Sequence, residues 1–217
     1  MSNFIIRLAS GLLFVTTIFF CTTLSNATLI SLFAILYILC IYEFIKISSK
    51  KNLFLNILVL TLSFSILVFS ENFGFNNNNQ ILIIFSAIWI FDSIAYLVGS
   101  KFGKNKMFIK ISPKKSWEGF FSGFFAFMMY IYLVYLFAPD FLFEISSKIE
   151  MLKFSLIPIT ATAGDFYISH LKRKANLKDS GKLIPGHGGI LDRMDSILFT
   201  FPILNLVIWK YIKKDIK

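Results

Sequence analysis

Long apolar runs, each bounded by a short polar segment, follow one another along almost the whole chain. A helix needs about 20 consecutive apolar residues to cross the hydrocarbon core of a bilayer. Runs of roughly this length occupy residues 5–24, 27–47, 53–70, 81–99, 119–138, 152–171 and 196–212. The pattern predicts an all-α, polytopic membrane bundle of about seven transmembrane helices, a count that is good to about one.

The composition supports a membrane protein. Of the 217 residues, 56% are hydrophobic and only 16% are charged. A soluble domain has about a quarter charged residues and could not bury so much apolar surface. Lipid must therefore be the solvent for most of the chain, and membrane lipids are expected partners.

The first apolar run allows a second interpretation. Arg7, the run 8–20 and the small residues at 25–27 also resemble a secretory signal peptide with its cleavage site. Because several further apolar runs follow, we expect this segment to be a first transmembrane helix.

Basic residues cluster between particular apolar runs. Twelve of the 22 lysines and arginines lie in two polar segments, after the fourth and after the sixth run. They are Lys101, Lys104, Lys106, Lys110, Lys114, Lys115, Lys172, Arg173, Lys174, Lys178, Lys182 and Arg193. Lysine and arginine gather on the cytoplasmic side of membrane proteins. With a cytoplasmic N-terminus, both segments lie on the cytoplasmic face of the plasma (inner) membrane.

The C-terminal tail departs from this rule, because seven crossings would place Lys213, Lys214 and Lys217 outside. Either one span is miscounted, or part of the glycine-rich stretch 169–196 re-enters the membrane, or the last run does not fully cross.

The net charge of +10 could suggest a nucleic-acid partner, but the positions of the charges argue against one. Basic loops beside membrane spans are typical of topology signals and of contact with anionic lipid headgroups. They are also typical of a pocket for a highly anionic substrate, and charge alone does not separate these alternatives.

Two aspartates lie inside apolar runs, where a carboxylate costs about 3 kcal/mol even on lenient insertion scales. Asp92 follows the letters IWIF and Asp165 follows ITATAG. Such acids usually face a polar interior and have a function, although an ion pair with a loop lysine would also explain them. Asp165, Ser169 and Lys172 have i, i+4, i+7 spacing, so one helical face presents a carboxylate, a hydroxyl and an ammonium group.

A further pair of acids, Asp192 and Asp195, begins the last run. Each could cap a helix N-terminus, but together with Asp165 they could supply the hard oxygen ligands that Mg²⁺ prefers. The preceding glycines at 186–189 either form a tight turn or let backbone amides approach phosphate oxygens. His187 is either a phosphate donor or a buried hydrogen-bonding residue.

The stretch 169–195, SHLKRKANLKDSGKLIPGHGGILDRMD, resembles the signature of the phosphatidate cytidylyltransferases, which are also called CDP-diacylglycerol synthases. Three upstream stretches resemble the same family: DSIAY from Asp92, SPKKSWEG at 112–119, and GD at 164–165. Residues 1–91 resemble the family only in being hydrophobic and in having Glu43 near the end of a span. We therefore divide the chain into N-terminal transmembrane helices, 1–91, and a catalytic transmembrane region, 92–217.

The resemblance implies a reaction in which CTP and phosphatidate give CDP-diacylglycerol and pyrophosphate. It implies that Asp165 and Asp192 hold a catalytic Mg²⁺ beside Asp195, and that Lys172 acts in catalysis. It implies a substrate-binding set made of Ser112, Lys114, Lys115, Ser116, Ser169, Arg173, Lys178, Asp179, His187, Gly188, Gly189 and Arg193. A second cation, which could be monovalent, and a homodimer are left open.

Other functions would require other features. A lipid-alcohol kinase that uses CTP or ATP shares this architecture, but it would release a nucleoside diphosphate in place of pyrophosphate. A CDP-alcohol phosphotransferase would need D-x-x-D-G-x-x-A-R, whereas Ser-Ile-Leu-Phe follows Asp195. A carrier for an anionic solute would favour two related halves, which the sequence does not contain.

Overall fold

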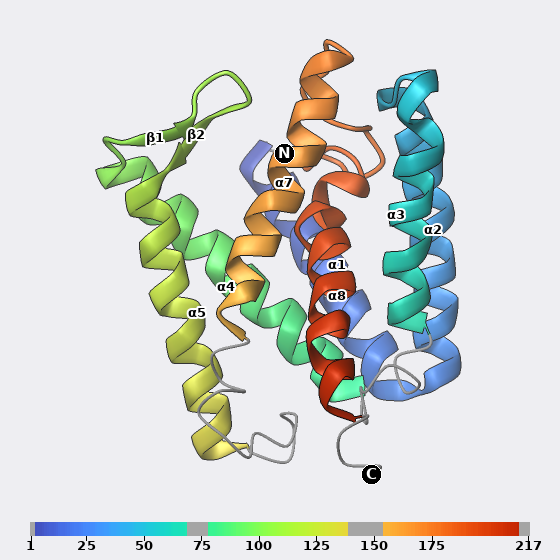
Figure 1. The fold of residues 1–217 in the computed structure, drawn as a ribbon, viewed down its shortest axis with the longest axis vertical. Helices are drawn as coiled ribbons and strands as arrows, with labels where there is room; N and C mark the ends of the chain where they lie inside the picture. The colour runs from blue at the N-terminus through green and yellow to red at the C-terminus, as the bar shows by residue number, and fades with distance from the viewer. Residues whose placement is uncertain (1–2, 69–77, 139–153, 213–217) are drawn as a thin grey trace.

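A computed structural model describes residues 3–68, 78–138 and 154–212 (Figure 1). Within these ranges, each predicted apolar run corresponds to one long helix. The helices are α1 (Asn3–Leu24), α2 (Asn26–Ile47), α3 (Lys50–Val68), α4 (Asn78–Phe102), α5 (Trp117–Phe137), α7 (Leu156–Lys174) and α8 (Leu191–Ile212). The prediction of a helical bundle is confirmed at this level.

Three of the helices are long and apolar enough to cross a membrane, judged by length and composition: Asn26–Ile47, Gln80–Phe102 and Trp117–Phe137. The apolar parts of α1 and α3 are shorter, Leu8–Leu24 and Asn52–Val68. The structure is thus that of a helical, membrane-type protein, and the crossing of all seven helices stays a prediction.

A β-hairpin between α4 and α5 corrects the all-α prediction. Its strands are β1 (Lys106–Phe108) and β2 (Ser112–Ser116), which pair antiparallel. Each strand has a free edge, so Pro113 is tolerated although it cannot donate a ladder hydrogen bond. The carboxylate of Glu118 accepts hydrogen bonds from the backbone and the side chain of Asn105, which fastens the hairpin to the start of α5.

The helices alternate in direction, so the basic segments meet at one end of the bundle (Figure 1). The hairpin, the α2–α3 turn, the loop between α7 and α8 and the start of α1 all lie at this end. Helix α8 runs from this end to the other. The tail lysines at 213–217 lie outside the described residues.

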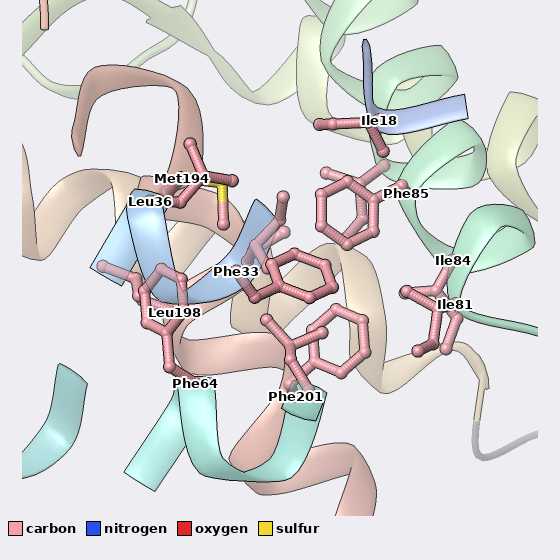
Figure 2. Packing of buried hydrophobic residues seen from close by; sticks show 14 of the residues in the cluster. Ile18, Phe33, Leu36, Phe64, Ile81, Ile84, Phe85, Met194, Leu198 and Phe201 are labelled. Atoms are coloured by element: carbon pink, nitrogen blue, oxygen red, sulfur yellow. The ribbon is translucent and has the colours of Figure 1, made fainter. Parts of the chain in front are cut away.

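Helix α8 is held from several sides. Phe201 of α8 is fully buried and packs against Phe85 of α4, which in turn packs against Phe33 of α2, with ring centroids 5.9 and 6.0 Å apart (Figure 2). The hydroxyl of Ser63 on α3 donates a hydrogen bond to the Leu198 carbonyl. These contacts fix the position of the first turn of α8, which carries Asp192 and Asp195.

Glycines bring α4 and α5 into close contact. A Cβ at Gly119 would lie 2.5 Å from the Ala95 carbonyl oxygen, and a Cβ at Gly123 would lie 2.7 Å from that of Phe91. The close approach of these two helices sets the position of the hairpin that joins them.

We expect Gly123→Ala to force α4 and α5 apart, because its methyl group would meet the Phe91 backbone. Overpacking of this kind costs about 1–3 kcal/mol, which lowers the thermal midpoint by roughly 3–10 °C. The midpoint of the purified protein in detergent measures this. Phe125→Leu, on the outer face of the same helix, is the control and should change the midpoint little. Equal midpoints for both variants would contradict the packing argument.

Candidate active site

A cavity of about 340 Å³ lies where α4, α7, α8, the hairpin and the glycine-rich loop meet. It brings together most of the charged residues that the sequence predicts for the site. These are Lys114, Lys115, Ser116, Asp165, Lys172, Asp179, His187, Asp192, Arg193 and Asp195. Asp92 and Ser196 also line it, although the sequence assigned neither of them a role in the site.

Six other predicted residues lie beside this cavity or away from it. Ser169 contacts the cavity indirectly, through a hydrogen bond of 3.1 Å to Asp165. Gly188 and Gly189 pack against Asp192, while Ser112 belongs to the hairpin. Arg173 is exposed and donates to the Leu177 carbonyl, and Lys178 is exposed on the loop.

Asp165 forms an ion pair with Lys115 of the hairpin. This is the alternative that the sequence left open for an intramembrane acid, an ion pair with a loop lysine. Both side chains keep about a quarter of their surface exposed, 23% for Asp165 and 27% for Lys115, and both line the cavity. The ion pair therefore lies in the site and leaves both groups accessible to a ligand.

Lys115 stays protonated at neutral pH. Burial by itself lowers its pKa, but the negative charges of Asp165 and Asp92 and the hydrogen bond to Asp165 outweigh burial, so the pKa lies above its usual 10.5. The ammonium group also lies 5.0 Å from the centroid of the Phe166 ring, where the face of the ring attracts a cation. The hairpin thus delivers a permanent positive charge to the cavity.

Asp192 is the most tightly held carboxylate of the site. Its Oδ1 accepts a 2.6 Å hydrogen bond from the Lys172 ammonium, and its Oδ2 accepts two 2.9 Å bonds from the backbone amides of Ser180 and Gly189. The Lys172 and Asp192 side chains are only 9% and 7% exposed. Two fixed amides and one cation leave this carboxylate little freedom to turn.

Asp195 and Asp92 complete the acidic wall. Asp195 is 8% exposed and accepts a hydrogen bond from the Ser196 amide, while the Ser196 hydroxyl donates to Asp92 at 3.3 Å. Asp195 thus bonds to the amide of its neighbour and also lines the cavity, so capping alone does not account for it.

The glycine-rich loop is a tight turn. Gly186 and Gly188 have φ angles of 73° and 87°, a region that residues with a Cβ rarely adopt. The amides of Ile184 and His187 donate to carbonyls within the loop, and that of Gly189 donates to Asp192. These three amides already have partners, and the two positive φ angles identify the glycine-rich segment as a turn.

His187 is a hydrogen-bonding residue at the edge of the cavity. Its Nδ1 lies 2.8 Å from the hydroxyl of Ser10, which also donates to the Pro185 carbonyl. A Cβ at Gly11 would lie 3.2 Å from the ring, so α1 offers a fitted surface to the histidine. The sequence gave no sign of this contact, because Ser10 is one hydroxyl within an apolar helix.

Glu43 lies behind the glycine-rich loop, in contacts that the sequence did not predict. It lies on α2, is 1% exposed, and accepts hydrogen bonds from the loop and from the start of α8. The signal that identifies Asp92 and Asp165, an acid at the end of or within an apolar run, applies equally to Glu43.

A second cavity of about 290 Å³ adjoins the first between α1 and α4. The two share Asp92, His187, Asp192, Arg193 and Asp195, but the second is also lined by Phe14, Val15 and Trp89. The charged cavity and the partly apolar cavity therefore meet at Asp92, Asp192 and Asp195.

The donor set of the charged cavity fits Mg²⁺. Within the described ranges no three His, Cys, Asp or Glu residues gather as a ready-made metal site. However, Mg²⁺ usually takes one or two protein carboxylates together with water and substrate phosphates. Asp165 and Asp192 face the same cavity, and so does Thr162, whose buried hydroxyl has no partner among the described residues. The cavity thus offers two hard anionic ligands and an unsatisfied polar group.

The fold and the site define a helical, membrane-type protein with a highly charged cavity at one end of its bundle. Residues 62–211 match the model of the cytidylyltransferase family, and the chain belongs to this family. The match covers the hairpin, the loop and every residue that lines the charged cavity.

Bacterial relatives carry a more specific name. A phosphatidate cytidylyltransferase of Rickettsia bellii is 38% identical over 164 residues, which cover 74% of this chain and 70% of that protein. One of Rickettsia conorii is 36% identical over 220 residues, covering 95% of this chain and 91% of that protein. One of Thermotoga maritima is 41% identical over 128 residues, covering 58% of this chain and 47% of that protein.

We expect Lys172→Met to destabilise the protein, because it leaves the buried Asp192 without its charge partner. The loss of about 3–5 kcal/mol corresponds to roughly 5–15 °C in the thermal midpoint in detergent. Adding Asp192→Asn should restore part of this stability, since a neutral amide needs no counter-charge. Lys174→Met, at an exposed position of the same helix, is the control. Strict additivity of Lys172→Met and Asp192→Asn would show that the pair does not interact.

Proposed function

We propose that this chain transfers the cytidylyl group of CTP to phosphatidate and releases pyrophosphate. The observation that carries the proposal is the charged cavity, where Asp165, Asp192 and three lysines meet within the region that matches the cytidylyltransferase family. The relatives named above support phosphatidate as the acceptor.

The reaction needs charge neutralisation more than a strong base. An oxygen of the lipid phosphate forms a bond to the α-phosphorus of CTP, and the bond from that phosphorus to the oxygen bridging the α and β phosphates breaks. The electron pair leaves with pyrophosphate. Because a phosphate monoester is already anionic near neutral pH, the site has mainly to hold two anions together in line.

The lysines of the cavity are suited to this task. Lys115 and Lys172 each pair with a carboxylate, and Lys114 and Arg193 also line the cavity. Phosphate oxygens compete with the carboxylates for the ammonium groups of the first two, so binding of the substrates exchanges one ion pair for another. Mg²⁺ held by Asp165 and Asp192 would compensate these two carboxylates when the ammonium groups turn to phosphate, so that no buried charge would be left unpaired.

Asp165 and Asp192 would hold Mg²⁺ in this reaction. When bound, the ion supplies Lewis-acid neutralisation of the triphosphate charge. The amides of Ser180 and Gly189 keep Asp192 oriented toward the cavity, and Ser169 does the same for Asp165. A second cation remains a prediction.

The adjoining cavity suits the lipid part of the acceptor. Its walls of Phe14, Val15 and Trp89 are apolar, whereas its inner end reaches the acids and Arg193. A diacylglycerol moiety can lie against such walls while its phosphate enters the charged cavity.

We infer that the protein is a multi-pass protein of the plasma membrane with its active site facing the cytoplasm. The basic segments lie at one end of the bundle (Figure 1), their residues Lys114, Lys115 and Arg193 line the cavity, and positive charge gathers on the cytoplasmic side. CTP is a polar nucleotide of the cytoplasm, so the orientation places the cavity where this substrate is present. A homodimer also remains a prediction.

The test is an assay of purified protein with CTP, Mg²⁺ and phosphatidate that measures pyrophosphate and the liponucleotide together. We expect both products in equal amounts, whereas a lipid kinase would release a nucleoside diphosphate. Asp165→Asn should lower turnover by about 100-fold or more, because it removes an anionic ligand from the site. Lys174→Met is the control. Near wild-type turnover of folded Asp165→Asn protein would refute the assignment of Asp165 as a metal ligand.

A further inference from the structure

Glu43 projects from α2 into the base of the glycine-rich loop. Its Oε2 accepts hydrogen bonds from the Ser180 hydroxyl at 2.6 Å and from the Leu191 amide at 2.9 Å. Its Oε1 accepts a bond of 3.1 Å from the Ile190 amide. The first amides of a helix have no partner within the helix, so Glu43 caps α8 from a distant part of the chain.

The loop is shaped around this carboxylate. A Cβ at Gly189 would lie 2.5 Å or less from both Glu43 oxygens, and a Cβ at Gly181 would also collide with Glu43. Gly181 and Gly189 do not have positive φ angles, so their backbone conformation does not require glycine. Glycine is needed at these two positions because the Glu43 carboxylate lies too close for a Cβ.

The loop residues that bind Glu43 are Ser180, which also orients Asp192, and the two residues that follow Gly189. Ser180 donates its hydroxyl to Glu43 and its amide to Asp192. Gly189 donates its amide to Asp192, and the next two amides along the chain donate to Glu43. Two carboxylates therefore bind one short loop, and they share Ser180 as a donor.

We propose that Glu43 is a positioning residue for the catalytic site, which fixes the loop 178–191 and through it the orientation of Asp192. Glu43 lines neither of the two cavities, so it acts without touching a substrate. The expected effect of Glu43 on turnover rests on the proposed function, whereas its hydrogen bonds to the loop do not.

The geometry of the carboxylate makes Glu43→Gln a sharp test. Each Glu43 oxygen accepts at least one backbone N–H, and a backbone amide cannot rotate to become an acceptor. Either orientation of the glutamine amide therefore places its NH₂ group against an N–H donor. Ser180→Ala removes only the hydroxyl bond and leaves both backbone bonds, so its effect should be smaller.

The hold on the loop can be measured by limited trypsin digestion of the full-length protein in detergent. Lys178 and Lys182 are exposed on the loop, and Lys104 and Lys106 are exposed near the hairpin. We expect Glu43→Gln to accelerate cleavage at the two loop lysines by about fivefold or more, because local opening controls such cleavage, and to leave the hairpin sites unchanged.

Glu118→Ala provides the matched control, because it removes the carboxylate that fastens the hairpin through Asn105, as Glu43 fastens the loop. It should accelerate cleavage near the hairpin and not in the loop. Unchanged loop cleavage in Glu43→Gln would overturn the proposal. So would equal acceleration at both places, which would indicate general destabilisation.

The kinetic test is the half-saturating concentration of Mg²⁺ for CTP- and phosphatidate-dependent turnover. Misorientation of Asp192 in Glu43→Gln should raise this half-saturating Mg²⁺ concentration by about tenfold. Loss of a group that hydrogen-bonds to a metal ligand typically has an effect of this size. Loss of folded protein alone would lower the maximal rate and leave half-saturation unchanged, and that result would count against positioning. Glu43→Asp, which keeps both acceptor oxygens, should restore part of the wild-type value.

Absence of product from wild-type protein would refute the proposed function, while the digestion would still test whether Glu43 fixes the loop.

Discussion

The buried carboxylate of Asp192 is the constraint around which the site is organised. An ionised carboxylate away from water costs several kcal/mol unless a counter-charge and hydrogen bonds compensate for the lost hydration. Lys172 of α7 supplies the charge, and amides of the loop supply the bonds. One charge thus dictates how α7, the loop and the start of α8 meet. The Asp165–Lys115 pair does the same for α7 and the hairpin.

The helices and several charged residues of the site were predictable from the sequence, because both depend on local properties. Apolar runs of sufficient length predict each helix, and an acid such as Asp165 in an apolar run is costly wherever its helix packs. The family signature also placed Asp192 and Lys172 in one site. In the structure these two residues line a common cavity.

Pairings between distant segments were not predictable, because periodicity says nothing about which helices become neighbours. The sequence showed that Asp165 could pair with a loop lysine, but not that the lysine would be Lys115. Ser10 carries no signal at all. The hairpin was missed because its strands are only three and five residues long, too short to show an alternating pattern. The glycines permitted two interpretations, and the turn became visible only from the φ angles and amide partners of the folded loop.

The long-range contacts of Glu43 have a consequence for biogenesis. Its partners lie 137 to 148 residues further along the chain, at Ser180, Ile190 and Leu191. During synthesis α2 emerges long before them, so its acid has none of its native partners at that stage. Maturation of the site is therefore a late event, and a nascent chain stalled before Ser180 would hold an acid whose native hydrogen-bond donors have not yet been made.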